Sequence, residues 1–466
     1  MKYEMVIGLE THIELSTNSK LFCDCKAKFG EEPNTNVCPV CLGHPGVLPN
    51  LNRSAVEYTI QAGLSIGCAI APLSKMDRKH YFYPDLPKAW QTSQLYAPLC
   101  IGGTVELASG RVIRMNHIHL EEDAGKLIHE RGRIYIDYNR GGVPLMECVS
   151  EPDLRSADEA VEYLEILQGV MRTIGVSDCR MQEGSMRCDV NISLRPEGAE
   201  KLGIRAEIKN LNSFTAVRAA IAYEYERQTE ILDNGGTVVQ ETRGFDGKTT
   251  ASLRDKENSD DYRYFPEPDI ITIAVSDADV ERLQSQLPEL PRVREARYVA
   301  ALGLSEKDAA QLSKYRRVAE FFENAGASKL AANLILTQMF SRISTEVERE
   351  LWNVPFSALD LKALIFLIDS GKLARNAAKQ VLTAMLDSGE AAETIASREG
   401  LLSTGEAIDL AAAVADAIAA NPGAAADYKA GKTKAAQAII GAVMKATKGK
   451  ANPEELRKTA ENALSQ

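Results

Sequence analysis

Four cysteines near the start of the chain form two close pairs, Cys23 with Cys25 and Cys38 with Cys41. Two thiol pairs separated by a loop of this length can supply four thiolates in tetrahedral geometry, the arrangement of a structural zinc site. Because four thiolates complete the coordination shell, such a metal would fasten the loop 23–41 and leave no position for a substrate. Two alternatives stay open: four unliganded thiols, or a partial site that uses His44.

Polar residues that can bind metal recur at every second position of the first strand-like segment. Glu10, His12 and Glu14 alternate with apolar residues, so they would face one side of a strand. Two later segments repeat this pattern. Their alternating polar residues are Arg187, Asp189, Asn191, Ser193 and Arg195, then Arg205, Glu207 and Lys209.

A sheet face of this composition suggests the floor of a site, because acids bind divalent metal and cations bind phosphate. Each strand taken alone fits an ordinary solvated face better than a site. The run 117–126 favours a site, since acids clustered beside His117 and His119 are costly unless a cation neutralises them. Strand parity does not decide between Glu121 and Glu122.

Two segments, 77–88 and 259–268, interleave basic residues with aromatic ones. Base stacking combined with phosphate pairing would use such a mixture, and so would aromatic packing under a loop. Near the C-terminus, eight Lys and Arg residues against three acids lie between Asp427 and Lys458. That local excess fits either a solvated helical face or a contact with an RNA backbone.

Other features narrow the class of protein. The sequence has neither a GxxxxGKS/T phosphate loop nor a GxSxG nucleophile elbow, which disfavours a P-loop ATPase and a hydrolase with a covalent nucleophile. The formal net charge of −11 means that any nucleic-acid site must be local. The chain shows no signal-like apolar region and no apolar run long enough for a bilayer, which predicts a cytoplasmic protein without a membrane contact.

The pattern of the chain changes near residues 287–292. Upstream, period-2 segments such as 5–15 and 133–139 are mixed with helical segments at 157–174 and 214–232, which predicts an α+β domain on a largely antiparallel sheet. Downstream the pattern is helical, with N-cap residues at Ser305 and Ser357. The last sixty or so residues are rich in alanine and lysine and suggest a small, separately packed helical unit.

Long runs of the sequence resemble one known family. In chain order these runs are VIGLETHIEL (6–15), DRKHYFYPD (77–85), EEDAGK (121–126), SEPDLR (150–155), EGSMRCDVNIS (183–193), EIKNLNSF (207–214) and DYRYFPEPD (261–269). They are similar to the B subunits of the bacterial aspartyl/glutamyl-tRNA amidotransferases, and the likeness extends from residue 1 to residue 466. The resemblance implies a glutamine-synthetase-like cradle domain over 1–291, an all-α helical domain over 292–406 and a small α-helical YqeY-like tail over 407–466 that binds tRNA.

The resemblance also implies a two-step reaction. ATP phosphorylates the side-chain carboxylate of Glu-tRNA(Gln), Asp-tRNA(Asn) or both, and ammonia then displaces the phosphate. The implied partners are an amidase, the A subunit, which supplies ammonia, and a small C subunit, together forming a heterotrimer that acts on mischarged tRNA. The implied cofactors are Mg²⁺, with ATP as substrate, and a structural Zn²⁺ at the four cysteines.

Site residues follow from the resemblance in the same way. The implied magnesium ligands are Glu10, His12, Glu122, Asp189 and Glu207, which breaks the tie in favour of Glu122. We infer from the strand faces that Arg187 and Lys209 contact phosphate. Lys79, Tyr81 and Tyr83 would lie near the aminoacylated 3′ end of tRNA, and the tail lysines that would contact tRNA are Lys432, Lys434, Lys445 and Lys448.

Two rival interpretations make different predictions. A self-contained ligase for free amino acids would turn over ATP with free glutamate and ammonia. A non-catalytic zinc-bearing RNA adaptor would tolerate Glu10→Gln or Asp189→Asn without loss of amidation.

Overall fold

A computed structural model describes residues 2–255, 259–402, 409–430, 432–447, 451 and 453–465. The chain divides into two compact units, Met1–Leu290 and Pro291–Gln466. This division lies next to the predicted change of pattern at residues 287–292. The predicted boundary between residues 406 and 407 falls outside the described residues.

The first unit is built on a ten-stranded sheet. Its strands are β1 (Tyr3–Glu14), β2 (Ala69–Ile70), β6 (Cys100–Ile101), β7 (Thr104–Glu106), β8 (Val112–Glu122), β11 (Pro144–Ser150), β12 (Met186–Pro196), β13 (Ala206–Leu211), β14 (Glu241–Phe245) and β15 (Thr250–Asp255). The strand order is β15-β14-β13-β12-β1-β11-β8-β6-β2, and β7 also pairs with β8. The described pairings in this sheet are antiparallel except for β13 with β14, which confirms the largely antiparallel sheet predicted from the period-2 segments.

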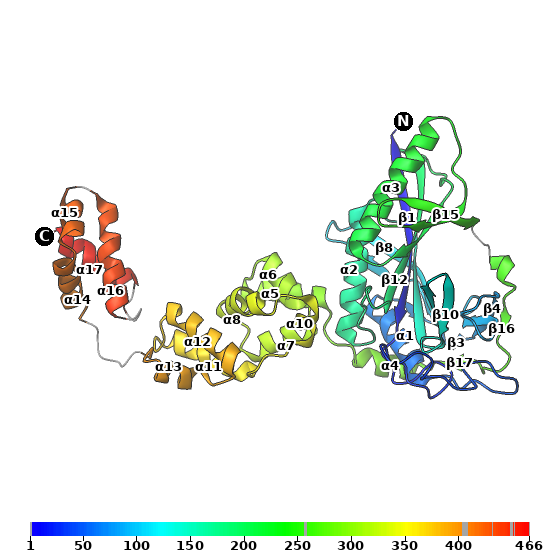
Figure 1. The fold of residues 1–466 in the computed structure, drawn as a ribbon, viewed down its shortest axis with the longest axis horizontal. Coiled ribbons are helices and arrows are strands. Elements are labelled where there is room, and N and C mark those ends of the chain that lie inside the picture. The colour runs from blue at the N-terminus through cyan, green and yellow to red at the C-terminus, as the bar shows by residue number, and fades with distance from the viewer. Residues whose placement is uncertain are drawn as a thin grey trace. The chain divides into compact units, whose positions relative to one another are not determined.

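Helices cover one face of this sheet, as Figure 1 shows for α2 (Ala157–Ile174) and α3 (Phe214–Asp233). Helix α2 has the predicted bounds. It begins after Ser156, whose side chain accepts a hydrogen bond from the backbone N–H of Glu159, and ends at Gly175, whose left-handed φ of 79° suits glycine. The other α-helices among the described residues of the unit are α1 (Arg53–Ser65) and α4 (Asp277–Ser285), and a short 3-10 helix spans Ser259–Tyr262.

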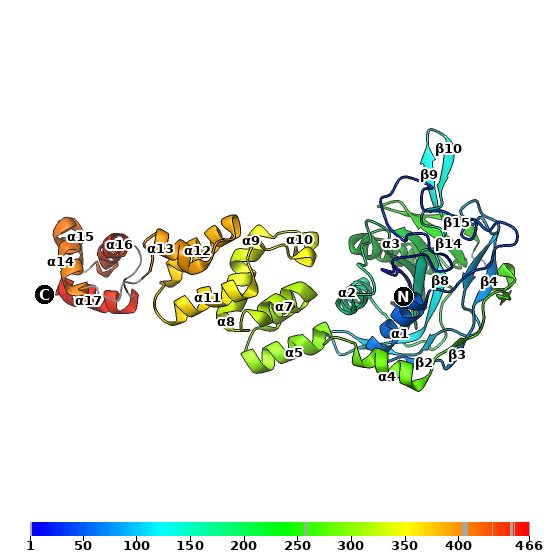
Figure 2. The same cartoon turned by 90° about the horizontal axis from the view of Figure 1, so that it is seen from below.

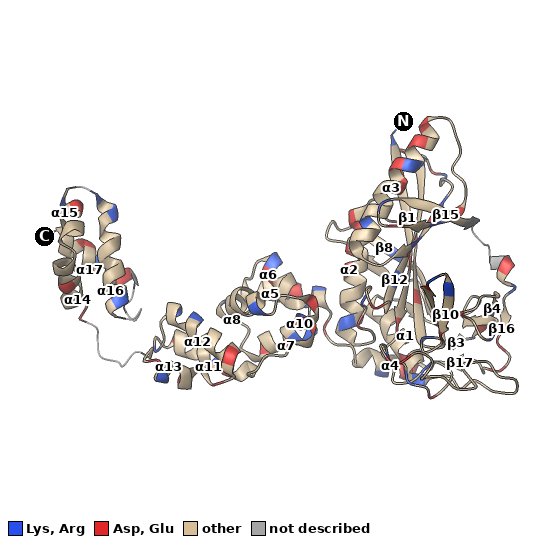
Figure 3. Cartoon of the chain, in the orientation of Figure 1, with Lys and Arg blue, Asp and Glu red and all other residues tan. Residues whose placement is uncertain are grey.

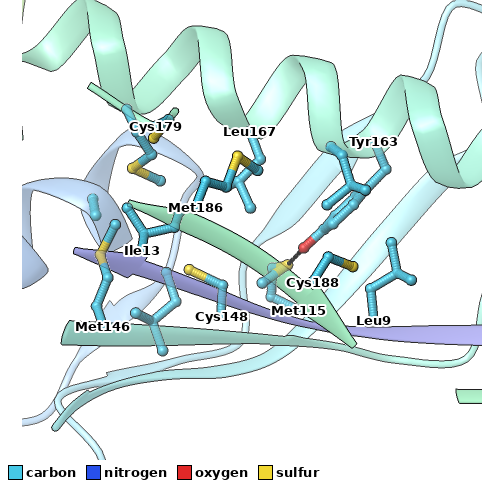
Figure 4. Close-up of a cluster of buried hydrophobic side chains, with 14 of the residues drawn as sticks. Leu9, Ile13, Met115, Met146, Cys148, Tyr163, Leu167, Cys179, Met186 and Cys188 are labelled. Carbon is cyan, nitrogen blue, oxygen red and sulfur yellow. Dashed lines mark hydrogen bonds between the residues drawn. The ribbon is translucent and has the colours of Figure 1, made fainter. Parts of the chain in front are cut away.

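The core lies between these helices and the odd-numbered residues of β1. Leu9 and Ile13 point toward α2, where they join Tyr163 and Leu167 (Figure 4). Because side chains alternate across a strand, the even-numbered residues of β1 face the opposite side of the sheet. The helices therefore cover one face, and the other face carries Glu10 and His12.

Smaller sheets accompany the large one. Strands β9 (Lys126–Glu130) and β10 (Arg133–Asp137) form a hairpin that projects from the unit (Figure 2). The predicted strand at 133–139 is thus confirmed, but in a separate two-stranded sheet. A three-stranded sheet joins β16 (Phe265–Pro266), β4 (Asp77–His80) and β5 (Trp90–Ser93), and β17 (Ile273–Ala274) pairs with β3 (Leu73–Ser74).

The second unit is helical, as the sequence predicts. Its helices are α5 (Pro291–Leu302), α6 (Glu306–Ser313), α7 (Arg316–Asn324), α8 (Lys329–Leu334), α9 (Phe340–Arg342), α10 (Glu346–Leu351), α11 (Ala358–Asp369), α12 (Arg375–Ser388), α13 (Ala392–Arg398), α14 (Leu410–Ala420), α15 (Pro422–Lys429), α16 (Ala436–Ala446) and α17 (Pro453–Ser465). Both predicted N-caps are confirmed: Ser305 caps α6, and Ser357 forms a capping box with Asp360 at α11.

The buried side chains of the second unit fall into two separate clusters, one within residues 298–401 and one within residues 414–464. Figure 3 shows acidic and basic residues interspersed over these helices. Among the described residues, no helix combines the length and the apolar character needed to cross a lipid bilayer.

Candidate active site and metal centres

The polar face of the large sheet is assembled around β1, because this strand pairs with β11 on one side and β12 on the other. The register places Glu10 opposite Asp189 and places His12 between Arg187 and Glu147. Residues that lie directly opposite across antiparallel strands have neighbouring side chains. Acids that are far apart in the sequence are thereby brought together.

Glu10, Asp189 and Glu207 form the first group. Each offers a carboxylate oxygen, and these oxygens lie within 4.8 Å of one another. Three hard oxygen donors from three neighbouring strands fit a hard divalent cation such as Mg²⁺. The family resemblance implied these three residues, together with His12 and Glu122, as ligands of one metal. The structure brings the three together and places His12 and Glu122 outside this group.

Polar neighbours hold the carboxylates of this first group in place. The Asn191 Nδ2 amide donates to Glu10 Oε1 at 2.9 Å, and the Thr242 hydroxyl donates to Glu207 Oε2 at 2.7 Å. Lys209 contacts both Asp189 and Glu207. Burial alone would lower the pKa of Lys209, but Asp189 and Glu207 outweigh that effect and raise it, so the ammonium stays charged.

A second group consists of His12, Glu121 and Glu147, whose nitrogen and oxygen donors also lie within 4.8 Å of one another. His12 Nε2 is 3.4 Å from Glu147 Oε2 and 3.8 Å from Glu121 Oε1. Burial alone would lower the pKa of His12, but the charges of Glu147 and Glu121 outweigh it and raise the pKa to about 9. One imidazole with two carboxylates is a donor set that fits a divalent cation.

Two further histidines extend the second group along β8. His119 Nε2 lies 3.4 Å from Glu147 Oε2 and 3.5 Å from Glu121 Oε2, and His117 Nε2 lies 3.1 Å from His119 Nδ1. Burial alone would raise the pKa of Glu147, but His12 and His119 outweigh it, so its pKa falls below the usual range. Imidazole–carboxylate contacts of this kind fix the orientation of metal-binding side chains.

The four cysteines of the loop also come together, with their sulfur atoms within 4.8 Å of one another. The backbone N–H of Cys38 donates to Cys41 Sγ at 3.2 Å, and Lys20 Nζ lies 3.7 Å from the same sulfur. A hydrogen bond from Cys23 is the main cause that lowers the pKa of Cys41, with Cys38 and Lys20 adding to it. Thiolate ligands with N–H and ammonium neighbours can hold a soft or borderline metal ion, so the predicted quartet has the donor atoms that such an ion requires.

The comparisons with known proteins agree with this geometry. A family model described as the GatB/GatE catalytic domain matches residues 5–281, and a model described as the GatB domain matches residues 317–464. The chain belongs to the GatB family. The first matched range contains both carboxylate groups and the four cysteines.

Curated GatB proteins match over nearly the full length. The chain is 48% identical over 476 residues to the aspartyl/glutamyl-tRNA(Asn/Gln) amidotransferase B subunit of Thermoanaerobacter pseudethanolicus, with 100% of both chains covered. The proteins of the same name from Caldicellulosiruptor saccharolyticus and Syntrophotalea carbinolica are 47% and 45% identical, with 97% and 99% of each chain covered.

One implied GatB ligand, Glu122, lies apart from both groups. Its carboxylate contacts Lys88 Nζ and accepts the backbone N–H of Thr92 at 2.8 Å. Glu121, the alternative that strand parity left open, joins His12 instead. Both carboxylates are buried at the end of β8, where β5 packs against this strand. The Ser93 hydroxyl of β5 donates to Glu121 at 3.2 Å.

Sequence reasoning missed Glu147 altogether. The signal for it was present, because Glu147 is a single acid in the otherwise apolar and small-residue segment Pro144–Ser150. A charged residue on a strand of that kind needs a partner. That partner is on β1, far away in sequence.

The two residues expected to contact phosphate, Lys209 and Arg187, have different neighbours in the structure. Lys209 lies at the first carboxylate group, whereas Arg187 bonds Asp123, which is buried. Burial alone would lower the pKa of Arg187, but Asp123 outweighs it and raises the pKa above the usual range. Arg140 lies 3.6 Å from the same Asp123 carboxylate.

The predicted aromatic and basic segments of this GatB chain meet around Lys79. Its ammonium lies 4.7 Å from the ring centre of Tyr262 and 5.9 Å from that of Tyr81. Tyr83 is exposed. The pairing of β4 with β16 joins the two segments that the sequence singled out separately.

The tail lysines lie in the second unit. Lys432, Lys434 and Lys445 are exposed, and Lys432 Nζ pairs with Asp427 at 3.0 Å. Lys448 lies outside the described residues.

Proposed function

We propose that this chain is the component of a tRNA-dependent amidotransferase that activates the side-chain carboxylate of Glu-tRNA(Gln), Asp-tRNA(Asn) or both, and converts it to the amide. The observation that carries the proposal is the convergence of Glu10, Asp189 and Glu207 on the polar face of a sheet within the matched GatB/GatE catalytic domain. The relatives' shared name, which describes the B subunit of an amidotransferase, supports the same reaction class.

The proposed reaction has two balanced steps. In the first, a carboxylate oxygen of the aminoacyl group attacks the γ-phosphorus of ATP, the bond to the β-phosphate oxygen breaks, and ADP leaves. In the second, ammonia attacks the carbonyl carbon of the acyl phosphate, inorganic phosphate leaves, and the nitrogen loses one proton. Both partners of the first step are anionic, so the site must offset their repulsion.

The residues take separate parts in this proposal. Glu10, Asp189 and Glu207 would hold Mg²⁺, and His12, Glu121 and Glu147 would hold a second divalent cation. Bound Mg²⁺ would shield the γ-phosphate from the incoming carboxylate. Glu122 stays a predicted ligand, and ligation by it requires Lys88 to leave it.

The cations beside these acids bind and orient phosphate. Lys209 stands at the first group and would contact the phosphate chain without a change of protonation. Arg187 stays a predicted phosphate partner whose charge Asp123 partly offsets. Lys79, Tyr81 and Tyr83 would contact the aminoacylated 3′ end, where rings stack on bases and the ammonium pairs with phosphate.

The finer features of the fold and the assembly belong to the same proposal. The large sheet would be the floor of a glutamine-synthetase-like cradle, and the cysteine quartet would hold a structural Zn²⁺. The amidase partner, the A subunit, would supply ammonia, and the small C subunit would complete a heterotrimer in the cytoplasm. Lys432, Lys434, Lys445 and Lys448 in the YqeY-like tail would contact the tRNA backbone.

The central experiment is single-turnover conversion of Glu-tRNA(Gln) and Asp-tRNA(Asn) by the complex reconstituted with its amidase and small partners. We expect ATP-dependent amide formation with the native chain and almost none with Glu10→Gln. The matched control is Glu4→Gln on the same strand, which pairs with Arg195 outside both groups and should leave the rate unchanged. Full activity of Glu10→Gln would overturn the proposal, and amidation of free glutamate would favour the ligase alternative.

Metal content and tRNA affinity test the two remaining parts. The purified native chain should contain about one zinc per molecule, and Cys38→Ser should lower that content while Cys179→Ser, a buried cysteine outside the quartet, should not. Replacing Lys432, Lys434 and Lys445 by alanine should weaken tRNA binding with a smaller salt dependence. Unchanged zinc content or unchanged tRNA affinity would contradict the corresponding role.

A further inference from the structure

The irregular loop 81–89 connects β4 to β5 and carries Tyr81 and Tyr83, which are expected at the tRNA 3′ end. Within the loop, the backbone N–H of Leu86 donates to the carbonyl oxygen of Tyr83, and that of Ala89 donates to the carbonyl oxygen of Leu86, each at 3.0 Å. Short turns of this kind leave a loop free to move unless neighbouring segments hold it. The contacts made by those neighbours therefore decide where the two tyrosines lie.

Tyr138 holds the middle of this loop. Its hydroxyl donates to the carbonyl oxygen of Pro84 at 2.7 Å. Its ring lies against Gly125, where an added Cβ would come within 3.0 Å of the ring carbon Cδ1. The Gly125 N–H donates to the carbonyl oxygen of Asp85 at 2.9 Å. Because Tyr138 follows directly after β10, the base of the β9–β10 hairpin is joined to loop 81–89 (Figure 2).

Gly43 holds the end of the same loop. A Cβ added to Gly43 would lie 2.5 Å from Lys88 Cγ and 3.2 Å from Lys88 Cα, so glycine is required for the two segments to touch. Gly43 comes two residues after Cys41, in a turn where the Gly43 N–H donates to the carbonyl oxygen of Val40 at 3.0 Å. The last cysteine of the quartet is therefore fixed close to Lys88.

Lys20 connects that cysteine to Tyr138. The Lys20 side chain is fully buried, and its Nζ lies 3.7 Å from Cys41 Sγ and donates to the carbonyl oxygen of Tyr138 at 2.9 Å. A buried ammonium is costly without negative charge nearby. Four thiolates around one Zn²⁺ would supply that charge, because they outweigh the charge of the metal. A metal-loaded quartet would therefore stabilise Lys20 in the position from which it holds Tyr138.

The segment between the two cysteine pairs also contacts the hairpin base. The backbone N–H of Asn34 donates to Asp137 Oδ1 at 3.0 Å, and the Asn34 side-chain amide donates to the carbonyl oxygen of Ile136 at 2.9 Å. The Oδ1 atom of Asn34 accepts the backbone N–H of Tyr138 at 2.8 Å. A metal bound by both cysteine pairs would fix both ends of the segment that makes these contacts.

We propose, building on the proposed function, that the metal-loaded cysteine loop 23–41 holds loop 81–89 in the position that binds the aminoacylated 3′ end of tRNA. Lys20 and Tyr138 are the positioning residues that connect the two loops, and the contact of Gly43 with Lys88 acts beside them. Loss of the metal releases these contacts together. The effect falls on tRNA and not on ATP, because the proposed Mg²⁺ ligands of the first group lie on β1, β12 and β13.

Hydrogen exchange in the reconstituted complex measures this connection without catalysis. Removal of zinc by a chelator should speed exchange of the Leu86 and Ala89 amides at least about tenfold, because the loop then opens independently of the sheet. Exchange within α2 should stay native, and added Zn²⁺ should restore the slow rates. Native exchange in loop 81–89 after metal removal would overturn the proposal, and so would a purified native chain that contains no metal.

Tyr138→Phe tests the connection at one atom. It removes the hydroxyl and keeps the ring on Gly125, so the fold should be retained. We expect exchange in loop 81–89 to rise about threefold to tenfold, as for one lost hydrogen bond, with native zinc content. Tyr135→Phe, at an exposed tyrosine of the same hairpin, is the control.

The combination of Tyr138→Phe with metal removal distinguishes a connected path from two separate effects. The substitution should add nothing to the exchange of loop 81–89 in the metal-free complex, because both changes release the same contacts. Simple addition of the two effects would refute the connection. A general loss of stability would instead speed exchange within α2 as well, and that result would also count against the proposal.

Lys20→Met removes the buried ammonium and keeps a side chain of similar length. Zinc transfer to a coloured chelator should become at least about tenfold faster, as expected for the loss of a group that supports metal ligands, and exchange in loop 81–89 should rise. Lys28→Met, at an exposed lysine of the cysteine loop that pairs with Glu31 at 3.0 Å, should leave both rates native. A native rate of zinc transfer in Lys20→Met would overturn the role of Lys20.

Steady-state amidation separates this inference from the proposed function. Tyr138→Phe should raise the KM for mischarged tRNA about threefold or more, with kcat and the KM for ATP within about twofold of native. A native complex that forms no amide from ATP and mischarged tRNA refutes the proposed function, while the exchange rates still test the connection between the loops. An active complex in which Tyr138→Phe keeps the native KM for tRNA refutes the inference alone.

Discussion

The two faces of the large sheet differ in what their residues do, although they belong to the same strands. On β1, Glu10 and His12 face the carboxylate groups, while their neighbours Leu9 and Ile13 are fully buried against the helices. Adjacent residues of the strand thus have different roles: one belongs to a candidate metal site and the next stabilises the core. Substitutions at adjacent positions should therefore have effects of different kinds.

Charge neutralisation explains how the polar face can exist. Lys209 forms ion pairs with Asp189 and Glu207, and His12 pairs with Glu147, so each group has a cationic neighbour. The covered face has the opposite composition, with sulfur and hydrocarbon side chains around the Tyr163 hydroxyl (Figure 4). The comparison suggests that stability and activity can be varied independently.

The largest expected effect is on the polar face. Asp189→Asn removes a charge from the first group and should lower the single-turnover amidation rate about 10²- to 10³-fold. The free energy of unfolding should change much less than the rate, because the amide keeps the size of the side chain and Lys209 keeps Glu207 as an ion-pair partner. Asp153→Asn, which weakens an ion pair with Arg114 that belongs to neither carboxylate group, serves as the control for rate. A native rate for Asp189→Asn would contradict the assignment of this face.

On the covered face, Leu9→Ala should lower the free energy of unfolding by about 3 kcal/mol because it leaves a cavity in the core. Urea denaturation followed by Trp90 fluorescence, in a Trp352→Phe background, reports on the first unit. The amidation rate of the folded fraction should stay close to native. Leu73→Ala, at an exposed position, should change neither quantity. A thousandfold loss of rate in folded Leu9→Ala would break the distinction between the faces.

Glu224 on α3 is a charged exception on the covered side, paired there with Arg243 at 3.0 Å. Burial alone would raise its pKa, but hydrogen bonds from Arg227, Thr250 and Gln228 outweigh that and lower it. A carboxyl group with a lowered folded-state pKa stabilises the fold above its unfolded pKa, and that stabilisation disappears as the pH falls through the folded value.

Glu224→Gln should therefore cost about 1–3 kcal/mol at pH 7. The stability difference from the native chain should shrink as the pH falls below about 4.5. Denaturation curves at several pH values measure this, with the exposed Glu226→Gln on the same helix as control. A difference that persists unchanged at pH 3 would show that the charge of Glu224 is unimportant.

The smallest expected effect tests whether the covered face depends on the buried hydroxyl contact of Tyr163. The Tyr163 hydroxyl donates to Met115 Sδ at 3.1 Å. Because sulfur is a weak acceptor, Tyr163→Phe should change the free energy of unfolding by about 1 kcal/mol or less. The exposed Tyr135→Phe provides the baseline in the same assay. A loss of several kcal/mol would show that polar contacts matter on this face as they do on the other.

Local patterns in the sequence were sufficient for the elements themselves. Alternation predicted the faces of β1, β12 and β13, and the helical spacing of apolar residues predicted α2 to the residue. Each of these signals is carried by neighbours within a few residues of one another. The cysteine quartet was equally readable because its members lie within one loop.

The members of the second group could not be predicted from the sequence, because strand register decides which residues come together. Glu147 enters the site only because β11 pairs with β1, and nothing near residue 147 in the sequence specifies that partner. Glu121 and Glu122 are both buried at the end of β8, so neither polarity nor parity separates them. The family resemblance favoured Glu122, whereas the register of β8 with β11 brings Glu121 toward His12 and leaves Glu122 with Lys88.

The central place of β1 makes the length of this strand less tolerant of change than its composition. Deleting one residue between Tyr3 and Gly8 would shift the alternation and carry Leu9, Thr11 and Ile13 onto the open face. Glu10 and His12 would then be pushed under the helices without their cationic neighbours. Insertions and deletions acceptable to this protein are therefore expected in the loops that leave the sheet, while the residue count of its middle strand stays fixed.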